Sequence, residues 1–211
     1  MYHADLSGYI TIFTRNISTR FNTLFNTLLI SLEGWIIRDG NYPDFFTGQH
    51  CTFGLNIYEK HHRFRITSEQ KKELIPVRDA TYLASGEVLY HNSDSGLLIV
   101  DFGVIAYLET SRYESTVSPG DYLTGKISLG VDYYVCKDYF QYREGVPSML
   151  YRWRVEEVLI NNGPRSNPNN FLQRDYDEFI PIHKTDAWRD DNGFSDYLLR
   201  CQRLSAKPEA W

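Results

Sequence analysis

Apolar and polar residues alternate along three long segments of the chain, at 97–108, 121–133 and 149–160. In the last segment Trp153 falls on the apolar face, whereas Arg152 and Arg154 fall on the opposite face. Successive side chains of a strand point to opposite faces, so this period of two predicts three long β-strands. Weaker patterns of the same kind predict further strands at 9–13, 28–37, 52–58, 64–66 and 82–91.

Helical spacing is confined to three short segments. Thr67 or Ser68 can cap a short helix that Pro76 must end, because proline has no N–H group and clashes with the preceding turn. Apolar residues at 18–28 fit a second short helix, and Ser195 can cap a third over residues 196–206. The chain is therefore predicted to be mainly β, a small antiparallel barrel or sandwich with a few short helices and a C-terminal helix.

A loop with the sequence NNGPRSNPNN follows the last long strand, at 161–170. Its asparagines and prolines favour turns, so we place a boundary there. A β-rich domain at 1–163 would precede a loop and helical extension at 164–211. The tripeptides at 47–49 and 124–126 both begin with Thr-Gly, and similar strand patterns follow them. This similarity is due either to chance or to an internal duplication. A duplication would divide the domain at about residue 76, into units at 1–76 and 77–163.

Glycines inside the predicted strands favour a curled sheet, because a missing side chain permits a bulge or a bend. Gly86, Gly103, Gly125 and Gly130 all fall within residues 82–133. The run GEVLYHNSDSGLLIVDFG, followed by PGDYLTGKISLG, resembles the first three strands of an OB-type barrel. The resemblance implies a small closed barrel, although no clear helix follows the third strand.

Charge and cysteine usage narrow the class of protein. The chain of 211 residues has 27 acidic and 22 basic side chains, a net charge of −5, which disfavours general affinity for nucleic acid or anionic membranes. We expect no membrane partner, because no run of 18 apolar residues occurs and the N-terminus lacks the features of a signal peptide. Three widely spaced cysteines suit reduced thiols, so the expected location is the cytoplasm.

No sequence signature of catalysis is present: the chain lacks the phosphate-binding, zinc-protease and nucleophile-elbow motifs. We therefore expect no enzyme, no cofactor and no metal site. The exceptions to be weighed are His50-Cys51 and His61-His62, which could supply a metal site or a Cys/His hydrolase if they converged. Cys136 and Cys201 are predicted to be core residues, and Asn92–Gly96 a hairpin turn rather than a calcium loop.

Tyrosine is the most informative residue type, because 16 Tyr outnumber 12 Phe and some must face solvent. Residues 81–163 hold eleven acidic and six basic side chains, a net charge of −5 that suits a basic protein partner. We predict a non-enzymatic protein-binding protein, similar in general character to bacterial toxin-immunity proteins. The alternatives are an OB-type nucleic-acid-binding module and a Cys51 hydrolase. The predicted partner-binding residues are Asp132, Tyr133, Tyr134, Asp138, Tyr139, Tyr142, Arg143 and Glu144.

Overall fold

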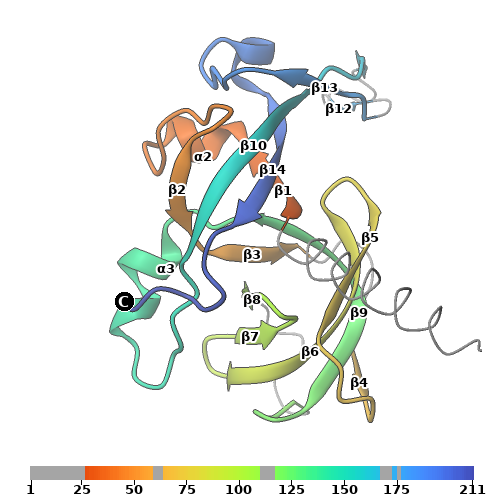
Figure 1. Cartoon of the computed structure of the whole chain (residues 1–211), viewed down its shortest axis with the longest axis vertical. Helices are drawn as coiled ribbons and strands as arrows, with labels where there is room; N and C mark the ends of the chain where they lie inside the picture. The colour runs from red at the N-terminus through yellow and green to blue at the C-terminus, as the bar shows by residue number, and fades with distance from the viewer. Residues whose placement is uncertain (1–26, 59–63, 110–116, 167–172, 175–176) are drawn as a thin grey trace, which may run out of the picture.

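A computed structural model describes residues 27–58, 64–109, 117–166, 173–174 and 177–211. The described chain is mainly β, with a closed barrel below a further part of the same twelve-stranded sheet, which we call the upper sheet (Figure 1). The predicted strand at 9–13 and residues 18–26 of a predicted helix lie outside the described residues. None of the described helices is long and apolar enough to cross a membrane.

The barrel is a ring of five strands. Around the ring β6 pairs with β7, β7 with β8, β8 with β3, β3 with β9, and β9 with β6. The predicted small barrel is thus confirmed, and it is consistent with an OB-like barrel. The strand that completes the ring, β3, precedes the others in the chain and is parallel to β8. The ring strands are β3 (Leu55–Tyr58), β6 (Thr81–Asn92), β7 (Leu97–Asp101), β8 (Ile105–Glu109) and β9 (Tyr122–Val131).

The long strand predicted at 97–108 is wrong in one respect, because the chain reverses at its centre. β7 and β8 form a hairpin whose turn contains Gly103 at a φ of 91°. The backbone N–H of Phe102 donates to the carbonyl of Val104 at 3.0 Å. Phe102 and Val104 are both buried, so the period of two continues unbroken through the turn and hides it.

The upper sheet has the order β13-β10-β14-β1, and β2 pairs with the other end of β10. It joins the barrel where β1 lies parallel to β9, with Ser31 opposite Gly130. Strands β4 and β5 extend the barrel sheet outside the ring, paired with β9 and β6. These strands are β1 (Thr27–Glu33), β2 (His50–Phe53), β4 (Arg65–Thr67), β5 (Glu73–Arg78), β10 (Tyr151–Asn161), β13 (Phe179–Ile182) and β14 (Asp196–Arg203).

The predicted C-terminal helix is wrong, because residues 196–203 form β14. This strand lies between β1 and β10 and pairs with both. Three successive residues, Tyr197, Leu198 and Leu199, are buried, so their apolar run reflects a strand covered on both faces rather than a helix stripe.

The helix predicted from Thr67 or Ser68 is also wrong, since β4 and β5 occupy that region and Pro76 lies within β5. β5 is the last strand of the sheet, where the missing N–H group of proline is tolerated. The remaining short elements are α2 (Gly34–Arg38), α3 (Val135–Asp138), η2 (Phe140–Tyr142), η4 (Asp190–Gly193), β11 (Arg165–Ser166) and β12 (Gln173–Arg174).

Trp153 lies at the centre of the upper core, as its place on the apolar face predicted. Its side chain is fully buried, its ring stacks on Phe53 at 5.4 Å, and its indole N–H donates to the Phe53 carbonyl at 3.1 Å. In the barrel, Gly86 permits close packing, because a Cβ atom there would lie 2.7 Å from the carbonyl oxygen of Asp101. This glycine is therefore required by contact between strands.

Candidate functional site

The tyrosine-rich segment predicted to bind a partner forms two short helical turns, α3 and η2, that follow β9 at the side of the molecule (Figure 1). Cys136 in α3 and Phe140 in η2 are completely buried. The Phe140 ring meets the Tyr107 ring edge-on at 5.0 Å. The burial of Cys136 and Phe140 holds the turns against the barrel and leaves Asp138, Tyr139 and Tyr142 exposed.

Asp132 was predicted to contact a partner, and the structure corrects this, because its side chain is completely buried. Its carboxylate accepts a hydrogen bond of 2.7 Å from the Tyr107 hydroxyl and longer ones from the Cys136 backbone N–H. The Tyr107 hydroxyl in turn accepts one from the Asn56 amide at 3.3 Å. Asp132 therefore anchors the start of α3 to the barrel and leaves no surface for a partner.

Burial raises the pKa of the Asp132 carboxyl above its ordinary value of 3.8, although its hydrogen bonds oppose the shift. The folded chain thus holds this proton more tightly than the unfolded chain, so the contribution of Asp132 to stability falls as pH rises from about 3.8 through the folded pKa. We expect Asp132→Asn to remove this fall while keeping an oxygen that accepts from Tyr107. Urea unfolding of both proteins from pH 4 to 7 measures the difference, and parallel pH profiles would contradict it.

Tyr133 and Tyr134 are half-buried and pack against the body of the protein. The Tyr133 hydroxyl donates to Glu109 at 2.9 Å. The Tyr134 ring lies 4.9 Å from the Tyr42 ring, and its backbone has a φ of 77°, which turns the chain from β9 into α3. Their contacts are mainly internal, so the structure separates them from the more exposed tyrosines.

Tyr139 and Tyr142 are the tyrosines that the segment does expose, with 53% and 78% of their surface accessible. The Arg143 guanidinium carbon lies 4.2 Å from the centre of the Tyr139 ring, so the two side chains form a cation–π contact. Glu144 follows and is exposed. We refer to Tyr139, Tyr142, Arg143 and Glu144 as the aromatic surface.

A shallow depression beside the aromatic surface includes residues that the sequence analysis missed. Arg143 and Glu144 form one side of it, and the hairpin between β6 and β7 forms the other. The sequence NSDSG predicts only a turn, and nothing in it shows that the hairpin lies beside residues about fifty positions later in the chain. The hairpin residues that line the depression are Tyr90, Asn92, Asp94 and Ser95.

The exposed charges of this region are mainly acidic, because its two basic side chains contact aromatic rings. Asp94, Asp138 and Glu144 are exposed and form no ion pair with another described residue. The two nearby cations lie over rings: Arg143 over Tyr139, and Lys137 over Tyr134 at 5.6 Å. A partner at this region would therefore meet exposed carboxylates that form no ion pair with another described residue, an arrangement complementary to a basic surface.

The alternative Cys/His site has only part of its residues within the described chain, because His61 and His62 lie outside it. Cys51 lies in β2, and burial raises the pKa of its thiol to about 12. A thiol of that kind is a poor nucleophile at neutral pH, since the thiolate is the reactive form. Cys136 and Cys201 are buried, and no group of three His, Cys, Asp or Glu residues in the described chain is arranged to hold a metal ion.

No protein-family model, curated protein or solved structure matches this chain.

Proposed function

We propose that this chain is a non-enzymatic protein that binds another protein through the aromatic surface. The observation that carries the proposal is the exposure of Tyr139 and Tyr142 beside Arg143, whose guanidinium contacts the Tyr139 ring. Tyr and Arg are enriched among the residues that dominate binding energy, and a side chain that is already ordered loses less entropy on binding. Anchoring by Cys136 and Phe140 gives this surface a fixed shape before the partner arrives.

The partner that best fits this surface is basic, because the nearby carboxylates form no ion pair with another residue of the described ranges and the whole chain carries a net charge of −5. A concrete version of the proposal is a bacterial immunity protein that acts in the cytoplasm by covering a toxin. The acidic, tyrosine-rich composition supports this version in general character. If the neighbouring gene encodes a basic toxin, its product is the first partner to test.

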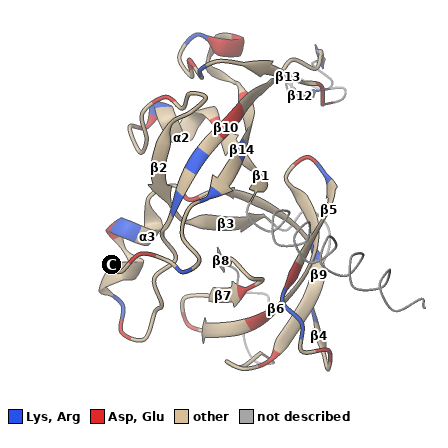
Figure 2. Ribbon diagram, in the orientation of Figure 1, with Lys and Arg blue, Asp and Glu red and all other residues tan. Residues whose placement is uncertain are grey.

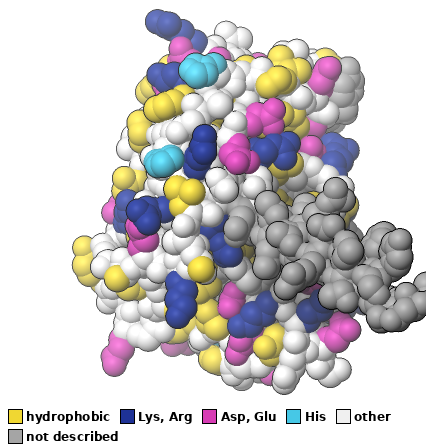
Figure 3. Space-filling view, in the orientation of Figure 1, with side chains coloured by type: hydrophobic (Ala, Val, Ile, Leu, Met, Phe, Trp, Pro, Cys, Tyr) yellow, Lys and Arg dark blue, Asp and Glu magenta, His cyan; other side chains and the backbone are white. Residues whose placement is uncertain are grey.

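A nucleic-acid-binding role is the second candidate, favoured by the OB-like barrel and the exposed aromatic rings. Charge opposes it. Acidic and basic residues both occur on the barrel and on the upper sheet (Figure 2), and on the face drawn in Figure 3 they are interspersed. A groove that follows a nucleic-acid backbone is instead lined by basic side chains.

An anisotropy titration with a fluorescent single-stranded DNA and its RNA counterpart at low salt separates the two candidates. We expect no saturation at micromolar protein. Micromolar or tighter binding that weakens with salt, and that is lost in Tyr142→Ala, would instead support the nucleic-acid role, because base stacking on one ring contributes about 1–3 kcal/mol.

A further inference from the structure

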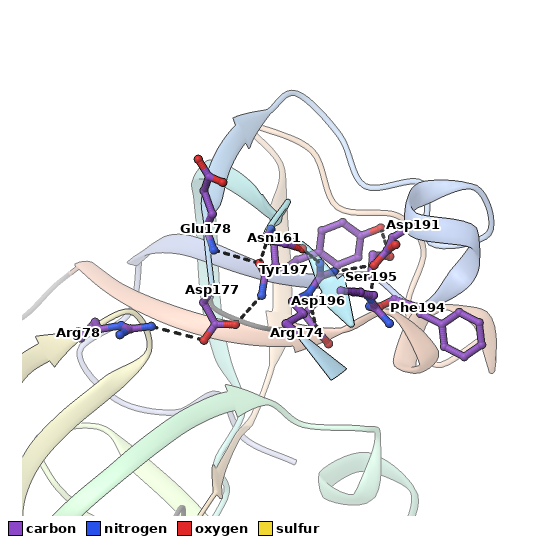
Figure 4. Close-up of polar contacts among 12 residues, drawn as sticks. Arg78, Asn161, Arg174, Asp177, Glu178, Asp191, Phe194, Ser195, Asp196 and Tyr197 are labelled. Carbon is purple, nitrogen blue, oxygen red and sulfur yellow. Dashed lines mark hydrogen bonds and ion pairs between the residues drawn. The ribbon is translucent and has the colours of Figure 1, made fainter. Parts of the chain in front are cut away.

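A cleft of about 420 Å³ lies between the barrel and the upper sheet. One wall comes from β1 and β14 of the upper sheet, and the facing wall comes from the turn between β5 and β6. The turn between β5 and β6 lies on the opposite side of the molecule from α3 in Figure 1, so the cleft is separate from the aromatic surface. Figure 4 shows part of it, with Arg78 reaching from the barrel toward Asp177.

Two carboxylates are directly opposed on the wall formed by the upper sheet. Glu33 in β1 is the cross-strand partner of Asp196 in β14, and both side chains line the cleft. Directly opposed residues of an antiparallel pair have their Cβ atoms about 5 Å apart, and like charges at such a position destabilise the sheet. The pair is only partly compensated: the Trp35 indole N–H donates to Glu33, and Arg174 lies 3.6 Å from Asp196.

Two further carboxylates line the cleft and share one cation: Asp79 lies in the turn between β5 and β6, and Asp177 lies just before β13 on the side of the upper sheet. The Arg78 guanidinium lies 2.8 Å from Asp79 and 3.5 Å from Asp177. Asn161, almost fully buried, donates to Asp177 at 2.7 Å and so holds it in place. Lys126 also lines the cleft and forms no ion pair with another described residue. The cleft is therefore lined by four carboxylates and by two cationic side chains, those of Arg78 and Lys126.

The rest of the lining suits the aliphatic part of a long side chain. Val77, from β5, has 49% of its surface exposed, and Phe179, from β13, is half-buried. Both line the same cleft as the carboxylates, together with the small hydroxyl side chains of Ser31, Thr81 and Ser128. Apolar surface next to excess negative charge is complementary to a side chain with an aliphatic stem and a cationic head.

We propose that this cleft binds an arginine or lysine side chain of a protein partner, with the cationic group between Glu33 and Asp196 and the stem against Val77 and Phe179. The like-charge pair is then a feature that costs stability in the free protein and becomes favourable on binding. Natural binding sites often show this exchange of stability for function. The proposal goes beyond the aromatic surface, and either site can fail without the other.

The test combines stability with binding of a defined probe. Glu33→Gln removes one charge of the pair and keeps an oxygen that accepts from Trp35, so we expect the free variant to melt about 1–3 °C above the parent protein. We expect the peptide acetyl-Gly-Arg-Gly-amide to shift backbone amide NMR signals of the cleft residues in the parent. Its affinity for Glu33→Gln should be about tenfold weaker.

Three controls make the result specific. Glu156→Gln removes the same charge from an exposed position outside the cleft, and it should change neither the melting temperature nor the peptide affinity. The same peptide with neutral citrulline in place of arginine should not bind. If Glu33→Gln does not fold, Asp196→Asn removes the other charge of the pair, and it should weaken peptide binding to a similar extent.

Three results would overturn the proposal. Unchanged or lower stability of Glu33→Gln would show that the like-charge pair does not destabilise the free protein. Equal peptide affinity for the parent and the variants would show that the cation binds elsewhere. Binding of spermidine without binding of the peptide would assign the cleft to a free polyamine rather than to a protein side chain. Because no result concerns Tyr139 or Tyr142, these outcomes leave the aromatic surface to its own test.

Discussion

Trp153→Ala should lower the free energy of unfolding by about 3–5 kcal/mol, the cost of replacing a large buried aromatic residue and leaving a cavity. Trp153 is fully buried, stacks on Phe53 and contacts the Tyr151 ring, and its indole N–H bond to the Phe53 carbonyl would be lost as well. Its place in β10, paired with both β2 and β14, means that the cavity would open where three strands meet. Equilibrium unfolding in urea measures the loss.

Arg152→Ala is the matched control on the opposite face of the same strand. The Arg152 side chain is 60% exposed and pairs with Glu209 at 2.8 Å, an exposed ion pair that contributes little. We expect a change of about 0.5 kcal/mol or less. Equal losses in the two variants would contradict the register of β10.

Tyr142→Ala and Tyr139→Ala should each raise the dissociation rate of the protein partner by about 10-fold to 30-fold, the range expected when a central aromatic anchor is removed. Both rings are more than half exposed, so their removal should change the stability of the free protein by about 0.5 kcal/mol or less. The association rate should fall with added salt, because steering by the acidic surface is screened. Surface plasmon resonance against the partner, over a range of salt concentrations, gives both rates.

Trp188→Ala is the matched control for these variants. Trp188 has 69% of its surface exposed, and the segment between β13 and β14 that contains it lies at the opposite end of the molecule from α3 in Figure 1. Its removal should leave the dissociation rate unchanged. A similar increase in all three variants would indicate general stickiness of exposed aromatic residues rather than a defined site.

Where burial is one-sided, the sequence predicts the fold well. The alternation around Trp153 identified both the strand and its buried face, since Trp153 is fully buried and Arg152 is exposed. The alternation of apolar and polar residues fails to identify β14, because Tyr197, Leu198 and Leu199 are covered on both faces and the apolar spacing of this segment also fits a helix. It fails at Gly103 for a different reason: the turn leaves Phe102 and Val104 on the same buried side.

The candidate site was predictable only in part, because exposure depends on distant residues. Asp132 has the same local sequence character as Asp138, yet Asp132 is buried and accepts a hydrogen bond from the Tyr107 hydroxyl, whereas Asp138 remains exposed. The opposition of Glu33 and Asp196 comes from strands at the two ends of the described chain. No local pattern reports such a pairing, so the cleft could not be inferred before the topology was known.

The most direct test of the protein-binding account is photocrosslinking in the cells that make this protein, with the photoreactive residue p-benzoylphenylalanine in place of Tyr142. The account predicts a protein adduct at a single mass, identified by mass spectrometry, that depends on light and is weakened in Glu144→Gln. The same crosslinker in place of Ile66, an exposed residue of β4 outside the cleft, should give no such adduct. Nuclease-sensitive adducts from position 142, or equal protein adducts from both positions, would contradict the account.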